Sequence, residues 1–197
     1  MIRILKPLKV EEILREKEIS LFSPEEFRRI FGVKEPAAQN FIKNHTKDLF
    51  IKFRNGLYAS RLNPPSEMEI ANRLLSPSYV SFEYALSRYG IIPESSYSIT
   101  SATTKLAREF TAQGKVYGYS QIKGAAYRGY RSERQGKVTV LIAEPEKALA
   151  DYLYFVDLRL KKLNDRLRTS RLKKTSVLRY AALFGRKSLT ELVKRVL

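Results

Sequence analysis

The sequence predicts an α+β protein made of two domains, residues 1–62 and 66–197. In the first domain, apolar residues at helical spacing are followed by two strand-like stretches around an Asn-Gly pair. The Asn-Pro-Pro-Ser stretch at 63–66 indicates a linker, because adjacent prolines stiffen the chain and interrupt regular structure. Helix and strand candidates follow it, and the last elements are helices. We therefore expect a small N-terminal domain and a larger mixed α/β domain that ends in helices.

Two helices joined by a short turn are expected early in the first domain, after a helical stretch at 8–18 and a short strand at 19–22. The Ser-Pro-Glu-Glu stretch at 23–26 is typical of a helix start. It combines a hydroxyl cap, a proline in the first turn and acids near the positive end of the helix dipole. Gly32 suits the end of this helix. The next helix is expected from about residue 35 to residue 45.

A β-hairpin is predicted directly after that helix. Residues 49–53 and 57–59 flank an Asn-Gly pair, which supplies the positive φ angles that a tight turn requires. The order helix, strand, helix, turn, helix, strand, turn, strand is that of a winged helix-turn-helix. In such a domain the helix at 35–45 would lie in the DNA major groove, which is wide enough to admit a helix.

The outer face of this helix is rich in amides and lysines, which suits contact with DNA. The alternative is that this face is merely solvated and binds nothing. Amides can pair with adenine, and lysines can reach guanine acceptors. The candidates for reading bases are Gln39, Asn40, Lys43 and Asn44. The candidates for holding phosphates or reaching a neighbouring groove are Lys34, Lys47, Lys52, Arg54 and Asn55. His45 lies near the apolar face and is expected to be packed or hydrogen-bonded rather than to read bases.

The second domain is expected to contain a mixture of helices and strands. The expected helices lie at 67–75 and 82–89, the latter capped by Ser81 and ended by Gly90. The expected strands lie at 96–103, 109–112, 115–122, 127–132 and 137–143. A long helix begins at 144–146 and carries an apolar stripe as far as Leu160, and two short helices at 176–184 and 188–196 finish the chain.

The chain carries a formal charge of +17, and the excess is concentrated near the C-terminus. Residues 157–197 hold 13 basic and 3 acidic side chains. A field of this sign attracts polyanions, with nucleic acid as the leading candidate, an anionic membrane as the second, and a basic surface without a dedicated partner as the alternative. The candidates for a second polyanion surface are Arg159, Lys161, Lys162, Arg166, Arg168, Arg171, Lys173 and Lys174.

Several classes of chemistry have no motif in this sequence. There is no cysteine and one histidine, which excludes disulfides, thiolate catalysis and metal sites built on either residue type. We find no glycine-rich phosphate loop or nucleophile elbow, so we expect no cofactor and no enzymatic activity. Glu144, Glu146 and Asp151 could form a carboxylate pair, but a helix start and its solvated flank account for them as well. With no signal peptide and no membrane-spanning apolar run, a cytoplasmic location is expected.

Several motifs together resemble the AbiE-type antitoxins of bacterial and archaeal abortive-infection systems. The first is at 22–32, and the second is Phe-Arg-Asn-Gly-Leu-Tyr-Ala at 53–59. The others lie at 78–94, 100–104 and 143–149, with Asp151 after the last. The resemblance extends over most of the chain, and the whole set is more specific than any one of its members.

The resemblance implies a repressor of its own toxin–antitoxin operon. In the family, the winged helix binds inverted repeats in the promoter, and the second domain counteracts a nucleotidyltransferase toxin, in many members without a stable complex. The family's DNA-binding helix corresponds to 35–45 here and its wing to 52–58, where Asn55 replaces a usual basic residue. The alternatives are a stand-alone winged-helix regulator whose second domain senses a ligand or dimerises, a nucleic-acid-processing enzyme, and an RNA-binding module.

Overall fold

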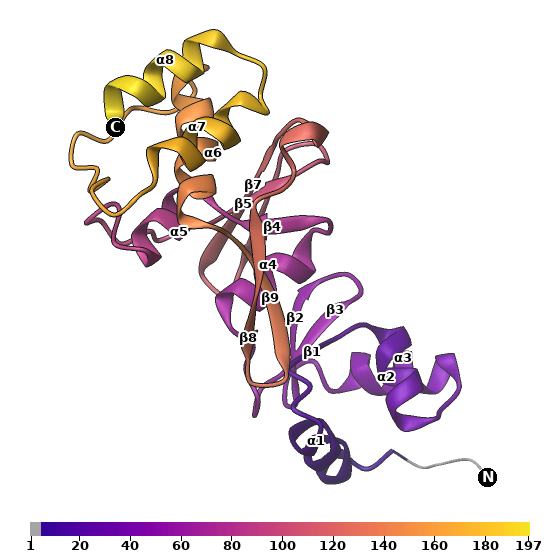
Figure 1. The fold of residues 1–197 in the computed structure, drawn as a ribbon. Helices are drawn as coiled ribbons and strands as arrows, with labels where there is room; N and C mark the ends of the chain where they lie inside the picture. Colours follow the sequence, from indigo (N-terminus) through magenta and orange to yellow (C-terminus); the bar gives the residue numbers. More distant parts are fainter. Residues whose placement is uncertain (1–4) are drawn as a thin grey trace. The chain divides into compact units, whose positions relative to one another are not determined.

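The computed structural model describes residues 5–197, which form two compact units, one up to Leu74 and one from Leu75 to Leu197 (Figure 1). Both units contain helices and a β-sheet, so the predicted α+β class is confirmed. The boundary follows helix α4 (Glu67–Leu74) instead of the Pro-Pro stretch. Contacts that hold α4 to the rest of the first unit include a hydrogen bond from the Ser20 hydroxyl to Glu69 over 2.5 Å and an ion pair between Arg73 and Glu26 over 2.5 Å.

The first unit combines four helices with a small antiparallel sheet among its described residues. Its elements are α1 (Pro7–Glu16), β1 (Leu21–Phe22), α2 (Pro24–Phe31), α3 (Glu35–Asn44), β2 (Phe50–Arg54), β3 (Leu57–Ser60) and α4. The strand order is β1-β3-β2, so the hairpin strand β3 lies between β2 and the short β1. The hairpin predicted around Asn55-Gly56 is therefore confirmed, and β1 extends it.

Helix α2 begins and ends as its sequence predicts. The Ser23 hydroxyl accepts a hydrogen bond from the Glu26 backbone N–H, and the Glu26 carboxylate accepts one from the Ser23 N–H over 2.7 Å. This reciprocal arrangement satisfies two N–H groups that a helix start leaves open. Gly32 ends the helix with φ of 62°, which glycine adopts without steric cost.

An aromatic core fixes the inner faces of α1, α2 and α3. Its buried members are Val10, Leu14, Phe22, Phe27, Phe31, Ala38, Ile42 and Phe50. The rings of Phe27 and Phe31 lie 4.4 Å apart, and Phe27 also meets Phe50 edge-on at 6.0 Å. Such ring pairs are each worth about 0.5–1.5 kcal/mol beyond the burial of their area. The core therefore determines which side of α3 faces outward.

The second unit is built on a six-stranded mixed sheet in the order β6-β7-β5-β4-β9-β8. Its strands are β4 (Ser78–Val80), β5 (Ile99–Thr103), β6 (Arg108–Ala112), β7 (Lys115–Gln121), β8 (Tyr130–Gln135) and β9 (Val138–Ala143). The pairs β5–β7 and β4–β9 are parallel, and the remaining neighbours are antiparallel. Strand β4 was not predicted, because three residues are too short to show a period, yet it joins the two halves of the sheet.

Helices gather beside this sheet. They are α5 (Phe82–Arg88), the 3₁₀ turn η1 (Gly124–Ala126), α6 (Pro145–Asp157), α7 (Lys174–Ala182) and α8 (Lys187–Val196). Helices α6, α7 and α8 pack on one another, and α5 packs on α6 (Figure 1). Within residues 5–197, no helix combines the length and the apolar character needed to cross a membrane.

Four expectations about the second unit were wrong. Helix α6 ends at Asp157, so Leu160 lies beyond its apolar stripe and is 69% exposed. Ser81 stands at the start of α5 without capping it, because its hydroxyl donates to the Asp151 carboxylate over 2.8 Å. Asp151 was expected on the solvated flank of α6, but it is fully buried. The strand expected at 127–132 begins later, at Tyr130.

Candidate nucleic-acid interface

Helix α3 presents its polar face to solvent. Ala38 and Ile42 are buried in the aromatic core, whereas the four predicted base-reading residues Gln39, Asn40, Lys43 and Asn44 are all exposed. Asn40, Lys43 and Asn44 are three and four residues apart, so they form one stripe along the helix. The first turn contains Pro36, which suits a helix start because its missing N–H would have no partner there. The local sequence thus orients the stripe outward.

The predicted phosphate-holding residues are exposed too. Lys34 stands at the N-terminal cap position of α3, and Lys47 lies in the turn after the helix. Lys52, Arg54 and Asn55 lie on β2 and its turn, next to an irregularity in the β2–β3 register between Lys52 and Arg54. Within residues 5–74, these side chains are exposed to solvent.

Not all of these side chains are equally available. The Gln39 amide donates to Glu35 over 2.9 Å, and the Arg54 guanidinium donates to the backbone carbonyl of Asn55 over 2.9 Å. By contrast, the side chains of Asn40, Lys43 and Asn44 form no hydrogen bond or ion pair within residues 5–197. Because free donors and acceptors need no internal bond broken before binding, this stripe is the best-prepared part of the face.

His45 closes the helix instead of extending the polar stripe. Its ring lies 4.4 Å from the Phe41 ring, and its Nδ1 is 2.8 Å from the Asp48 carboxylate. The hydrogen bond from His45 lowers the pKa of Asp48. The expectation that His45 is packed and hydrogen-bonded is therefore confirmed.

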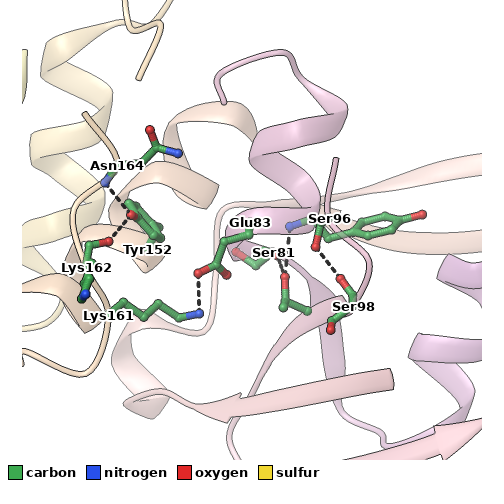
Figure 2. A network of polar contacts seen from close by, with 10 residues as sticks. Ser81, Glu83, Ser96, Ser98, Tyr152, Lys161, Lys162 and Asn164 are labelled. Atoms are coloured by element: carbon green, nitrogen blue, oxygen red, sulfur yellow. Dashed lines mark hydrogen bonds and ion pairs between the residues drawn. The ribbon is translucent and has the colours of Figure 1, made fainter. Parts of the chain in front are cut away.

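Some of the eight basic residues predicted as a second polyanion surface have a partner within the described chain, and others have none. All but Lys174 lie in the segment 158–173, which joins α6 to α7 without regular structure. Lys161 pairs with Glu83 (Figure 2), Arg166 pairs with Glu94, and Lys174 donates to the Lys194 carbonyl. The exposed residues without a side-chain partner in the described chain are Arg159, Lys162, Arg168, Arg171 and Lys173. The segment therefore carries an uncompensated positive charge.

The carboxylates near the start of α6 do not converge on one point. Glu144 accepts a hydrogen bond from the Tyr180 hydroxyl over 2.6 Å, and Glu146 accepts one from the Lys173 backbone N–H over 3.2 Å. Asp151 is buried and paired with Lys147. The part of the chain that the structure describes contains no group of three or more His, Asp or Glu side chains placed to hold a metal ion. Each carboxylate thus has a separate local partner.

Sequence reasoning missed a cavity in the second unit. It lies where the end of α5, the start of α6 and the segment 158–173 meet, and it includes Tyr89, Arg168 and Arg171 in its lining. The basic residues of 168–171 were singled out by their charge alone. Their position beside Tyr89 depends on a fold contact between residues far apart in sequence, so no local signal could have revealed it.

Neither a scan with protein-family models nor a search of the curated proteins gave a match to this chain. The resemblance to AbiE-type antitoxins therefore rests on the motifs at 22–32, 53–59, 78–94, 100–104 and 143–149 alone.

Proposed function

We propose that this protein is a sequence-specific DNA-binding repressor whose first unit is a winged helix-turn-helix. The observation that carries this proposal is the stripe of Asn40, Lys43 and Asn44, which is exposed and free of internal partners. The inner face of the same helix is anchored in an aromatic core. A polar stripe on a rigidly held helix suits the major groove, where base edges offer distinct donor and acceptor patterns.

In this reading α2 and α3 are the helix pair, and Gly32 makes the turn between them. The hairpin of β2 and β3 is the wing. Lys52 and Arg54 on the wing supply charge for the phosphate backbone, which positions the protein without reading sequence. The pairing of β1 with β3 ties the wing to the chain that enters α2. This connection supports a wing held in a defined position.

The wider biological role is proposed from the resemblance of the motifs. The operator would be a pair of inverted repeats in the protein's own promoter, and binding would repress that promoter. The second unit would counteract a nucleotidyltransferase toxin without a stable complex between the two proteins. The geometry of α3 is needed only for the first of these roles, so we expect the two activities to be separable by mutation.

Binding to the upstream region of its own gene tests the repressor proposal. Fluorescence anisotropy would compare that duplex with a shuffled duplex of equal length and composition. Asn40→Ala and Lys43→Ala are expected to weaken operator binding more than shuffled-duplex binding, by roughly 1–3 kcal/mol of discrimination. Lys17→Ala removes an exposed lysine from the end of α1 and serves as the matched control.

Three results would contradict the proposal. If the wild-type protein binds both duplexes equally, it has no operator in the tested region. If Asn40→Ala lowers affinity for the two duplexes by the same factor, the stripe on α3 does not read bases. If the control Lys17→Ala loses as much discrimination as Lys43→Ala, the loss does not come from base reading by the stripe on α3.

A further inference from the structure

The segment 158–173 is a long irregular connection that is nonetheless held in place. Loops of more than about 12–15 residues without secondary structure are uncommon in compact domains and are often functional. Lys161 pairs with Glu83, and the Tyr152 hydroxyl donates to the Lys162 carbonyl and accepts from the Asn164 N–H (Figure 2). These contacts fix the first half of the segment.

The second half is fixed as well. The Arg168 backbone N–H donates to the Ile91 carbonyl over 2.8 Å, and the Lys173 N–H donates to Glu146 over 3.2 Å. Between these anchors the Leu172 N–H donates to the Thr169 carbonyl over 2.9 Å, which makes a turn. The backbone at 168–172 is therefore held in one shape before any ligand arrives.

This turn forms one wall of a cavity of about 780 Å³. The other walls come from 89–91 at the end of α5 and from Pro145 and Glu146 at the start of α6. Pockets for small molecules have volumes of roughly 300–1,000 Å³, so the space suits a ligand the size of a nucleotide. A DNA duplex is too wide to enter it.

Two arginines give the cavity its charge. Arg168 and Arg171 both line it, both are exposed, and neither guanidinium has a partner in the described residues. Three acids of the surrounding elements have other partners: Glu83 is paired with Lys161, Glu94 with Asn164 and Arg166, and one Glu146 oxygen with the Lys173 N–H. Guanidinium groups match the geometry of phosphate oxygens and bind them through paired hydrogen bonds. The hydroxyls of Thr169 and Ser170 lie between the two arginines in sequence.

Beyond the two arginines, the walls of the cavity are largely apolar. Tyr89 is half-buried, and its hydroxyl donates to the Ala143 carbonyl over 2.8 Å, so its ring is held in place. Ile91, Pro145 and Leu167 add apolar surface to the lining. A purine or pyrimidine base can pack against such a wall, because every base has an apolar face. The Glu146 carboxylate, which also lines the cavity, can accept hydrogen bonds from the hydroxyls of a ribose.

We propose that this cavity is a binding site for a nucleoside diphosphate or triphosphate. Arg168 and Arg171 hold the phosphates, and the wall that contains Tyr89 receives the base. The site lies wholly in the second unit, so it adds a ligand to the DNA binding proposed for the first unit and does not depend on it.

Titration of the full chain with ADP, followed by calorimetry at constant ionic strength, tests this site. Saturable binding with one ADP per chain is expected, and inorganic pyrophosphate and adenosine should each bind at least about tenfold more weakly than ADP, because each lacks half of the contacts. Arg168→Ala combined with Arg171→Ala should weaken ADP binding by at least about tenfold. Lys187→Ala combined with Arg195→Ala removes the same charge from exposed positions outside this cavity and should leave ADP affinity unchanged.

Each other outcome would overturn the proposal. Absence of saturation at millimolar ADP would show that no nucleotide site exists. Equal losses in the two double variants would reduce the effect to general charge attraction. Pyrophosphate binding as tight as ADP would remove the role of the base wall, and binding of a long oligonucleotide but not of ADP would indicate a polyanion surface.

Equal thermal unfolding of the double variants and the wild type would show that the variants are folded.

Discussion

Lys147 and Asp151, one turn apart on α6, form an ion pair whose two side chains are completely buried. Asp151 also accepts hydrogen bonds from the Tyr79 hydroxyl over 2.9 Å and from the Ser81 hydroxyl over 2.8 Å. The Lys147 ammonium lies 4.8 Å from the centre of the Phe184 ring. Burial raises the pKa of Asp151, and the charge and hydrogen bond of Lys147 act in the opposite direction. The pair therefore connects α6 to the central strand β4 and to the end of α7.

Removing one partner of this pair should destabilise the second unit strongly. Asp151→Leu alone leaves the Lys147 ammonium without its counterion in the interior, and such losses cost about 3–5 kcal/mol. Lys147→Met combined with Asp151→Leu removes both charges and should cost much less than the sum of the two single changes. Urea unfolding followed by circular dichroism measures each loss. A double variant as unstable as that sum would show that the two charges are not coupled.

The buried carboxyl of Glu69 should make the first unit less stable as the pH rises. Burial raises the pKa of Glu69 above its ordinary value of 4.5, against the hydrogen bond from Ser20 and the charge of Arg73. Because its pKa is raised in the folded state, the carboxyl ionises more readily in the unfolded chain. Ionisation at higher pH therefore favours unfolding. Glu69→Gln is therefore expected to match the wild type below pH 4.5 and to exceed its stability increasingly as the pH rises through the folded-state pKa.

Thermal unfolding at several pH values measures this difference. Glu16→Gln removes an exposed carboxylate from α1 and should show no comparable gain. A Glu69→Gln variant that loses stability relative to the wild type as the pH rises would reverse the predicted sign.

Gly129 should not tolerate a side chain. Its φ is +78°, and a Cβ atom built on it would lie 2.5 Å from a ring carbon of Tyr180. Gly129→Ala must displace the Tyr180 ring, whose hydroxyl donates to Glu144 over 2.6 Å. A loss of about 1–3 kcal/mol is expected from this overpacking. Gly114→Ala is the matched control, because Gly114 has a similar φ of +73° and a Cβ added there meets nothing within 4 Å beyond its chain neighbours. Equal stability of the two variants in urea would contradict the close packing.

The wing should contribute charge rather than specificity. Arg54→Ala is expected to weaken binding to operator and shuffled duplex by similar factors. It should also reduce the slope of log affinity against log salt concentration by about one, because one phosphate contact is lost. Anisotropy titrations at four salt concentrations measure the slope. An unchanged slope would mean that the hydrogen bond from Arg54 to the Asn55 carbonyl keeps the guanidinium away from the backbone.

Part of the candidate interface could be predicted because it is a property of short stretches. An apolar period places Ala38 and Ile42 on one side of a helix, and that alone puts Asn40, Lys43 and Asn44 on the other side. The structure adds which of these polar side chains have partners. It also divides the C-terminal cations into those that hold the segment 158–173 and those that remain uncompensated.

The sequence by itself determined the elements whose causes are local. The capping box at Ser23 and Glu26, the helix end at Gly32 and the turn at Asn55-Gly56 all depend on hydrogen bonds and φ preferences within a few residues. Tertiary structure alone decided the burial of Asp151 against Tyr79 and the meeting of Arg168 with the end of α5. The physical reason is that desolvation and pairing depend on which distant segments fold together. No spacing along the chain encodes such neighbours directly.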